Sequence, residues 1–346
     1  MRIAITGATG NVGTSIVSVL GTDPTVDAIV GIARRRPSWQ PPKTRWVPAD
    51  ITTVDLDEVF RGVDVVIHLA WLIQPSRDQR AMWATNVVGT RRVLEAVGRT
   101  GVGRVITLSS IGAYAPAPAG LVVDESWPTD GVPESTYSWQ KAIQERAIAT
   151  FADTNPGCRS IVLRPALIFK REAAREIRNL FIGHLLPRRA VAVDGAVRLL
   201  RRSPLPFQCV HTNDVADAVR RCLTTDAVGA FNLAADGVIG TEGSARDRWS
   251  SLLGPLVAAA WRARLVPVDP GWIRLAASVP LLSTDRAADE LGWKPTRPAA
   301  DVLAELLAGL RADARFPTPP LDADRPWTQA TRDPALRSGP GSGRDR

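Results

Sequence analysis

The stretch IAITGATGNVG, residues 3–13, decides the fold, because an apolar run breaks into the three glycines Gly7, Gly10 and Gly13 and then continues at helical spacing. This order predicts a buried strand, a tight turn and a helix. Gly7 allows the turn, Gly10 allows close approach to a pyrophosphate, and Gly13 allows the helix to pack near the strand. A helix N-terminus then offers free N–H groups to the phosphates. The stretch predicts a dinucleotide-binding start; a glycine-rich turn without a ligand is the alternative.

The composition of the whole chain is that of an ordinary globular protein. Its 346 residues are 45% hydrophobic and 23% charged. The three cysteines Cys158, Cys209 and Cys222 are widely spaced, which indicates neither a disulfide framework nor a thiolate zinc site. No apolar run is long enough for a membrane span, and the first residues enter a strand directly. We therefore expect no membrane segment, no export leader and a cytoplasmic location.

The net charge of +8 raises the question of nucleic-acid binding. The basic residues are mostly arginines spread along the chain, and no nucleic-acid-binding motif accompanies them. We therefore expect no nucleic-acid partner.

A second apolar stretch, residues 28–33, ends in the basic residues Arg34, Arg35 and Arg36. In a nucleotide fold this strand end meets the adenosine ribose, where a carboxylate favours NAD and an arginine pairs with the 2′-phosphate of NADP. The sequence therefore favours NADP(H), held by Arg34 or Arg35, with NAD(H) as the other possibility. A solvated basic turn is the alternative without a ligand.

Further apolar stretches at residues 65–69 and 104–108 alternate with segments of helical periodicity. This alternation predicts the α/β class, with a Rossmann-type, doubly wound parallel sheet. Asp50 could accept a hydrogen bond from an adenine amino group or could be a simple loop acid. His68 lies within an apolar strand without a second ligand at metal-binding spacing, so we expect a hydrogen-bonded core histidine and no metal site.

Ser110, Tyr137 and Lys141 are the candidate catalytic residues. Ser109 and Ser110 follow the strand at 104–108, and Tyr137 and Lys141 are four residues apart at the start of a predicted helix, so both can face one site. A phenol is a weak acid–base catalyst at neutral pH, but a neighbouring ammonium favours the phenolate and lowers its pKa. Ser110 would donate a hydrogen bond to the substrate oxygen.

Taken together, several motifs resemble the short-chain dehydrogenase/reductases of the extended, NAD-dependent epimerase/dehydratase type. The resemblance covers residues 1 to about 312. Its motifs are TGATGNVG at 6–13, HLA at 68–70, the Ser109–Ser110 pair, YSWQK at 137–141, VLRPALIF at 162–169, VHTNDVADAV at 210–219, FNLA at 231–234 and LLSTDRAADELGWKP at 281–295.

The resemblance implies a role for each matching residue. Ser110, Tyr137 and Lys141 would be catalytic, and Asn86 would bind a water or backbone near them. Lys141 would also hold the nicotinamide ribose, and a homodimer would form through the helices that carry Asn86 and Tyr137. The implied cofactor-binding residues are Gly7, Thr9, Gly10, Asn11, Val12, Gly13, Arg34, Arg35, Asp50, Ile51, Leu69, Ala70, Trp71, Tyr137, Lys141 and Pro165.

We expect three regions along the chain. Residues 1–165 form the dinucleotide-binding domain, completed by parts of 205–235, residues 166–312 mainly form a smaller substrate-binding lobe, and residues 313–346 form a flexible tail. Residues 115–133 are long enough for a lid or substrate loop. The core of the smaller lobe is expected to include Trp249, Trp261 and Trp272.

Two features depart from the nucleotide-sugar enzymes of this family. Trp71 stands where a small residue is usual, and Lys170 and Arg171 replace a Tyr-Gly-Pro type of turn. Arg171, Arg175 and Arg178 share one face of a predicted helix at 172–183, where they could grip an acidic substrate or form a solvated basic face.

The sequence therefore predicts an NAD(P)-dependent oxidoreductase acting on a secondary alcohol or ketone of a small to medium, partly apolar substrate. An epimerase or dehydratase with a tightly held cofactor would use the same three catalytic residues. A non-catalytic NADP-sensing protein is the third possibility, although such proteins tend to lose the Tyr/Lys pair, which is present here.

Overall fold

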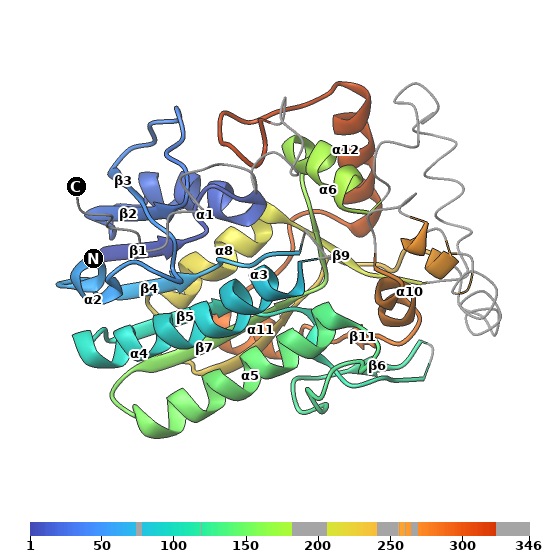
Figure 1. Ribbon diagram of the computed structural model, residues 1–346, viewed down its shortest axis with the longest axis horizontal. Coiled ribbons are helices and arrows are strands. Elements are labelled where there is room, and N and C mark those ends of the chain that lie inside the picture. The colour runs from blue at the N-terminus through green and yellow to red at the C-terminus, as the bar shows by residue number, and fades with distance from the viewer. Residues whose placement is uncertain are drawn as a thin grey trace, which may run out of the picture.

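The computed structural model describes residues 1–73, 78–118, 120–181, 206–240, 255, 257–259, 261–263 and 269–322. At its centre is a seven-stranded sheet in the order β10-β7-β5-β4-β1-β2-β3, with every neighbouring pair parallel (Figure 1). This is the strand order of a Rossmann fold, so the predicted fold class is confirmed. The strands are β1 (Arg2–Thr6), β2 (Ala28–Ala33), β3 (Thr44–Pro48), β4 (Val65–His68), β5 (Arg104–Leu108), β7 (Arg159–Pro165) and β10 (Gly229–Leu233).

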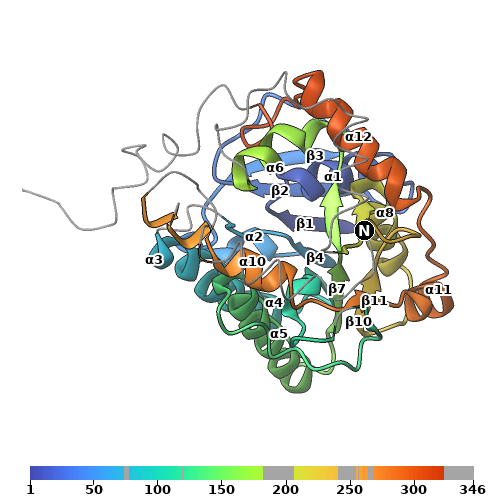
Figure 2. The ribbon, with the colours of Figure 1, turned by 90° about the vertical axis from the view of Figure 1, so that its right-hand side faces the viewer.

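Helices cover both faces of the sheet (Figure 2). The helices α1 (Asn11–Thr22) and α8 (Thr212–Cys222) pack on one face, and α2 (Leu56–Phe60), α4 (Thr90–Thr100) and α5 (Thr136–Thr154) pack on the other. Because side chains alternate along a strand, Ile3 and Ile5 enter the first core while Ala4 enters the second. Burial on both faces explains why these strands read as continuous apolar runs.

A continuous helical stretch leads into α4. It begins with α3 (Gln79–Trp83), passes through a π-helical turn at Ala84–Gly89, and carries Asn86 within that turn. Such π-helical turns occur frequently at functional sites.

Two small parallel pairs of strands lie outside the seven-stranded sheet. The strand β8 (Leu167–Phe169) pairs with β9 (Cys209–His211), and β6 (Val122–Val123) pairs with β11 (Leu281–Leu282). Two 3-10 turns, Ile111–Ala113 and Arg171–Ala173, lie near these strands. The helices that follow β8 in the chain include α6 (Ala174–Phe181), α10 (Gly271–Ala276), α11 (Asp285–Leu291) and α12 (Ala299–Arg311). The helices α6 and α12 lie side by side in Figure 1 and bury Ala174 against Val302 and Leu306.

Three features differ from the sequence expectations. The stretch 115–133, expected to be a lid, contains β6 and is tied to β11. The predicted helix at 172–183 is a 3-10 turn followed by α6, and its last two residues lie outside the described part, as does Trp249. The predicted flexible tail is packed at its start, because Thr318 and Leu321 are buried. Its remainder, residues 323–346, lies outside the described residues.

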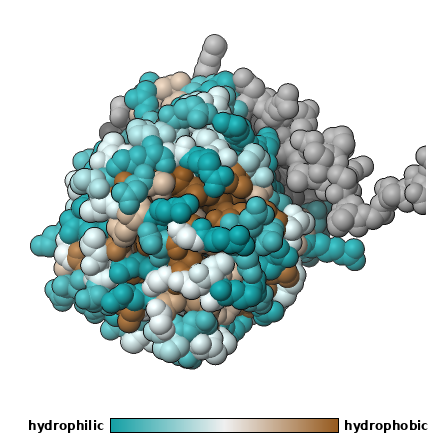
Figure 3. Space-filling model, turned by 90° about the vertical axis from the view of Figure 1, so that its left-hand side faces the viewer, coloured by the Kyte–Doolittle hydropathy of each residue, from teal (hydrophilic) through white to brown (hydrophobic). Residues whose placement is uncertain are grey.

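The two ends of the parallel strands lead to different surroundings. The face on the left of Figure 1, where β1 begins, carries hydrophobic residues interspersed with hydrophilic ones (Figure 3). The carboxyl ends of the strands lead instead into the cavities described next, as the parallel sheet requires.

Candidate active site

The glycine turn after β1 has the geometry that the sequence predicts. Gly7 has a φ of +70°, and its N–H donates to the Ile32 carbonyl at 3.0 Å. A Cβ on Gly13 would lie 2.5 Å from the Gly7 carbonyl oxygen, so only glycine lets α1 pack this close. The helix starts at Asn11 without a side-chain cap. Its first N–H groups are therefore available to an anion.

Two cavities lie side by side at this turn. The larger, of about 260 Å³, extends from the glycine turn to Tyr137, and the smaller, of about 160 Å³, extends from the same turn to Arg34 and Asp50. Both are lined by Gly7, Gly10, Leu69, Trp71 and Glu176. They therefore form one elongated site, as a dinucleotide requires.

Three buried polar atoms belong to residues that line the larger cavity and could meet a ligand. The Asn11 side-chain oxygen, the Trp71 indole nitrogen and the Ser109 hydroxyl have no hydrogen-bond partner within the described part of the chain. A buried polar group without a partner is costly, so these atoms fit a site that binds a polar molecule. Together with the glycine turn, they fit a dinucleotide cofactor.

The sequence-predicted residues of the larger cavity come together around one space. The residues predicted from the sequence that line it are Gly7, Gly10, Asn11, Val12, Gly13, Leu69, Trp71, Ser110, Tyr137, Lys141 and Pro165. Tyr137 and Lys141 lie in the first turns of α5, whose start is capped by the Ser135 hydroxyl accepting from the Ser138 N–H. Ser110 reaches the same space from the end of β5 and hydrogen-bonds to Tyr137.

The ionisation of Tyr137 differs from the sequence expectation. Burial raises the pKa of Tyr137 to about 12, against a smaller lowering by the Ser110 hydrogen bond. The expectation that Lys141 lowers this pKa is wrong for this structure. The ammonium of Lys141 instead donates to the Leu108 carbonyl at 2.9 Å and to Gln144 Oε1 at 2.9 Å. Burial, the largest cause of the shift, therefore sets the ionisation of Tyr137.

Lys141 is itself in an unusual environment. Burial lowers its pKa to about 7, and only the attraction of Glu145 opposes this shift. Its ammonium lies 3.6 Å from the centre of the Trp71 ring, within cation–π range. A lysine with such a pKa can hold or release a proton near neutral pH.

Aromatic rings enclose the Tyr137 side chain. Trp71 meets it edge-on with ring centres 6.1 Å apart, and the Trp272 ring is tilted by 32° to it with ring centres 4.7 Å apart. Trp272 was expected in the core of the second lobe; α10 brings it into the larger cavity instead. The cavity wall continues with the apolar residues Ile73, Leu167, Ile168, Ile177 and Leu275.

Asn86 positions the backbone around Trp71. Its Oδ1 accepts from the Leu72 N–H at 2.7 Å, and its Nδ2 donates to the Leu72 carbonyl at 2.8 Å and to Gln140 Oε1 at 2.7 Å. The resemblance implied a contact to water or backbone, and the structure has the backbone contact. Asn86 thus joins the segment that carries Trp71 to the helix that carries Tyr137.

A buried hydrogen-bond chain runs through His68. Thr90 Oγ1 donates to the Asn86 carbonyl at 2.7 Å, so it accepts from His68 Nε2 at 2.9 Å. His68 Nδ1 then accepts from Thr6 Oγ1 at 2.7 Å, which in turn accepts from the Ala70 N–H at 3.2 Å. The imidazole is therefore neutral, and burial lowers its pKa to about 3. His68 is the hydrogen-bonded core histidine that the sequence predicts.

The smaller cavity contains the remaining cofactor candidates except Arg35. Those that line it are Thr9, Arg34, Asp50, Ile51 and Ala70. The Asp50 carboxylate accepts from the Thr52 N–H at 2.9 Å and the Thr52 hydroxyl at 2.7 Å. Asp50 therefore stabilises its own loop as well as lining the cavity.

Sequence reasoning missed two charged residues of the site. Lys170 donates to the Asn11 carbonyl at 2.9 Å beneath the start of α1, and burial lowers its pKa to about 8. Glu176 lines both cavities, and burial raises its pKa to about 7. One sign of these two residues is present in the sequence, which is that Lys170 departs from the usual pattern of the family.

The basic face predicted from Arg171, Arg175 and Arg178 does not line the site. None of the three is among the described residues that line either cavity, and Arg175 lies 3.7 Å from Asp313. The described residues contain no cluster suited to a metal ion. In the same part of the chain, no helix has the length and apolarity to cross a membrane.

Comparison with known proteins identifies the family of this chain. The model of the NAD-dependent epimerase/dehydratase family matches residues 3–234. An uncharacterized protein of Mycobacterium tuberculosis is 27% identical over 323 residues, covering 90% of this chain and 30% of that protein. This chain therefore spans less than a third of that relative. A UDP-glucose 4-epimerase of Mycolicibacterium smegmatis is 28% identical over 331 residues, covering 90% of this chain and 99% of the epimerase.

Solved structures share the fold at low identity. A UDP-glucose 4-epimerase from Thermotoga maritima has a TM-score of 0.66 at 19% identity, covering 90% of this chain and 99% of its own. The dTDP-glucose 4,6-dehydratase DesIV from Streptomyces venezuelae, solved with NAD bound, has a TM-score of 0.64 at 22% identity, covering 90% and 98%. The match of the family model and the shared fold confirm the resemblance stated from the sequence. The chain belongs to the NAD-dependent epimerase/dehydratase family of extended short-chain dehydrogenase/reductases, a family of nicotinamide-dependent enzymes.

Proposed function

We propose that this protein is an NAD(P)-dependent oxidoreductase that acts on a secondary alcohol or ketone of a small to medium, partly apolar substrate. One observation carries the proposal. Ser110, Tyr137 and Lys141 line the same cavity as the glycine turn, so a proton donor and a nicotinamide cofactor can meet at one substrate.

Each residue has a role in this proposal. The bound cofactor supplies or accepts the hydride. Tyr137 gives a proton to the carbonyl oxygen or takes it back from the alcohol, and Ser110 donates a hydrogen bond to that oxygen. Lys141 holds the nicotinamide ribose. The glycine turn binds the pyrophosphate through the N–H groups at the start of α1.

The apolar walls of the cavity support a partly apolar substrate. Trp71 and Trp272 bound the space beside Tyr137, so that part of the cavity presents apolar rings to a substrate. A 3-diazoavenalumate denitrifying reductase from a Streptomyces species is 26% identical over 86% of this chain and 97% of its own length. The name of that relative describes a reduction, which agrees with the proposal.

A second candidate is an epimerase or dehydratase with a tightly held cofactor. The similarity to the Mycolicibacterium UDP-glucose 4-epimerase extends over 99% of that enzyme and favours it. A protein that binds NADP as a sensor without catalysis is the third candidate. The presence of Tyr137 and Lys141 in the cavity argues against a sensor, because a protein without catalysis needs no proton donor.

We propose NADP(H) as the preferred cofactor because Arg34 lines the smaller cavity, whereas NAD(H) is what the family's name implies. The three cysteines are free thiols, which supports a reducing, cytoplasmic location. No partner other than a small molecule and a second copy of the chain is proposed.

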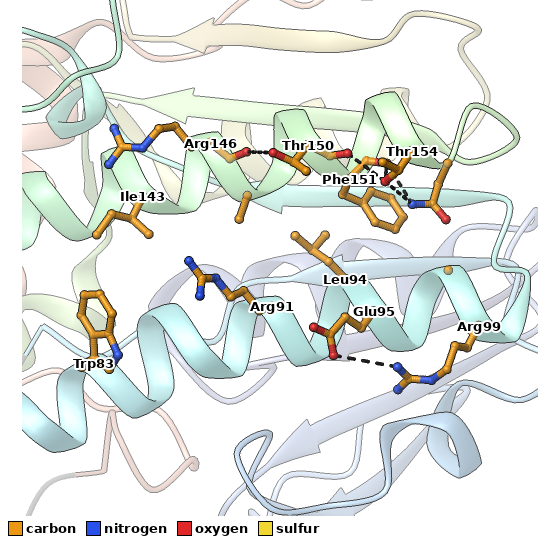
Figure 4. Close-up of a pocket in the computed structure, with 13 residues that line it drawn as sticks. Trp83, Arg91, Leu94, Glu95, Arg99, Ile143, Arg146, Thr150, Phe151 and Thr154 are labelled. Atoms are coloured by element: carbon orange, nitrogen blue, oxygen red, sulfur yellow. Dashed lines mark hydrogen bonds and ion pairs between the residues drawn. The ribbon is translucent and has the colours of Figure 1, made fainter.

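We also propose a homodimer formed through α4 and α5. A groove of about 800 Å³ runs between these helices, with Arg91, Leu94 and Glu95 on one wall and Arg146 and Phe151 on the other (Figure 4). At one end, Trp83 and Trp139 stack with ring centres 5.4 Å apart. Trp83 is 36% exposed and Trp139 is 44% exposed. Acidic and basic side chains side by side suit a twofold interface.

The dimer is tested by size-exclusion chromatography with light scattering. The unmodified chain is expected to have the mass of a dimer, and Trp139→Asp is expected to reduce it to a monomer. A monomeric unmodified chain would remove this part of the proposal.

The oxidoreductase proposal is tested by mixing the protein with NADPH or NADH and a panel of ketones and aldehydes. Consumption of the nicotinamide absorbance supports a reductase. Cofactor that co-purifies with the protein and does not exchange, together with sugar-nucleotide epimerisation, supports the second candidate. Tight cofactor binding with no turnover of any kind would favour the sensor.

A further inference from the structure

Residues 313–322 pack against the cofactor site, and we call them the strap. They follow α12 and have the sequence DARFPTPPLD. The strap is folded on itself by hydrogen bonds from the Leu321 and Asp322 N–H groups to the Thr318 carbonyl, at 2.9 and 2.8 Å. Thr318 and Leu321 are 1% and 2% exposed. These contacts are those of an ordered segment.

The strap is anchored on the loop that follows β2. The Phe316 ring meets Trp39 edge-on with ring centres 4.9 Å apart, and Trp39 accepts through its carbonyl from the Trp46 indole at 2.9 Å. Trp46 lies across β2 at Gly31, where a Cβ would be 2.5 Å from its ring. The anchor therefore rests on the strand whose end carries Arg34.

A second anchor joins the strap to the glycine turn. The Lys170 ammonium lies 5.3 Å from the centre of the Phe316 ring and donates to the Asn11 carbonyl at the start of α1. Asp313 lies 3.7 Å from the guanidinium of Arg175 on α6. Phe316 is thus held between Trp39, in the loop after β2, and Lys170, which hydrogen-bonds to the start of α1.

From these anchors the strap reaches the smaller cavity. Pro320 lines it together with Gly10, Arg34, Asp50 and Ile51, although more than 250 residues separate Pro320 from each of them in the sequence. Pro319 and Pro320 restrict the backbone beside the cavity before binding, so little conformational entropy is lost when a ligand packs against it.

We infer that the strap is a part of the cofactor site that binds the adenosine half of the dinucleotide. The inference rests on the proposed nicotinamide-dependent function. Pro320 supplies an apolar wall for the adenosine, and Phe316 fixes the position of that wall. Contact with the strap raises the affinity and slows the release of the cofactor, because the segment must lose these contacts before the ligand leaves.

The test uses ADP-ribose, which contains the adenosine half of the cofactor and lacks the nicotinamide. Isothermal titration calorimetry compares the full chain with the variants Phe316→Ala and Pro320→Gly. The control is Pro317→Gly, which makes the same change at an exposed proline of the same segment. Thermal unfolding of each variant verifies the fold, and stopped-flow fluorescence measures the release of NADPH.

We expect Phe316→Ala and Pro320→Gly each to bind ADP-ribose about tenfold more weakly, a difference of about 1.4 kcal/mol. NADPH release should be faster in both, and Pro317→Gly should bind within about twofold of the unmodified chain. Unchanged ADP-ribose affinity in the two folded variants would overturn the role of the strap alone. An unmodified chain that binds neither ADP-ribose nor NADPH would overturn both this inference and the proposed function.

Discussion

The ammonium of Lys141 lies over the ring of Trp71, 3.6 Å from its centre, while Tyr137, on the same helix, meets that ring edge-on. Because Trp71 lines both cavities, this contact lies where the two halves of the elongated site join. The Lys141 ammonium is buried and donates to the neutral acceptors of Leu108 and Gln144.

The burial of Lys141 predicts a pH dependence of stability. Its pKa falls from 10.5 to about 7 on folding, so between these values the unfolded chain binds a proton that the folded chain does not. The contribution of Lys141 to the free energy of unfolding therefore rises with pH across this window and is smallest below it. Relative to Lys141→Met, the unmodified chain should gain about 2 kcal/mol from about pH 7 to about pH 9 in urea denaturation. Parallel curves for the two proteins would contradict this.

Tyr137→Phe should remove the proton donor and reduce turnover by roughly a hundredfold or more, with cofactor binding retained. The other tyrosine of the chain is a matched control. Tyr114 is buried, and its hydroxyl donates to Asn232 Oδ1 at 2.8 Å and accepts from Arg164 at 3.0 Å. Tyr114→Phe should cost about 1–2 kcal/mol of stability and leave turnover intact. Equal turnover in Tyr137→Phe and the unmodified chain would refute the assigned role.

Gly13→Ala and Gly10→Ala should separate folding from cofactor binding. A Cβ at Gly13 would lie 2.5 Å from the Gly7 oxygen and 2.7 Å from the Ala8 carbonyl carbon, so Gly13→Ala should destabilise the protein by about 1–3 kcal/mol. A Cβ at Gly10 would meet the Gly7 oxygen at 3.5 Å, an ordinary contact. Gly10→Ala should therefore fold normally but bind NADPH about tenfold or more weakly. Thermal unfolding and calorimetry measure the two effects; normal NADPH affinity in Gly10→Ala would place the pyrophosphate elsewhere.

Arg34→Ala should weaken NADPH binding about tenfold or more and leave NADH binding nearly unchanged, because only NADPH carries the 2′-phosphate. Arg34 lines the smaller cavity, whereas Arg36, two residues further on, is not among its lining residues and serves as the control. Dissociation constants for both cofactors, measured at one ionic strength, give the ratio. A ratio that Arg34→Ala does not alter would show that Arg34 does not bind the 2′-phosphate.

The sheet could be predicted from the sequence because its strands are buried on both faces. The apolar stretches at 28–33, 65–69 and 104–108 become β2, β4 and β5 within one or two residues. The Tyr137–Lys141 spacing also sufficed to bring two site residues together, since a helix sets that distance locally. Short strands such as β6 and β8 have too few residues to show a periodicity.

Features that depend on distant contacts could not be predicted. The raised pKa of Tyr137 results from burial to which Trp272 contributes from far along the chain. Phe316 looked like part of a polar, proline-rich tail because its partner Trp39 is more than 270 residues away. The expected Tyr–Lys attraction was judged from spacing alone, whereas the orientation of Lys141 depends on the acceptors Leu108 and Gln144.

The position of β10 at the edge of the sheet has a consequence for how the protein is made. The strand β7 pairs with β5 on one side. On its other side it pairs with β10 (Gly229–Leu233), which follows some 65 residues later in the chain. Since a ribosome adds roughly 5–20 residues per second, a nascent chain exposes that open edge for several seconds. Unpaired strand edges are templates for association between chains, so this interval is when newly made copies most need a chaperone.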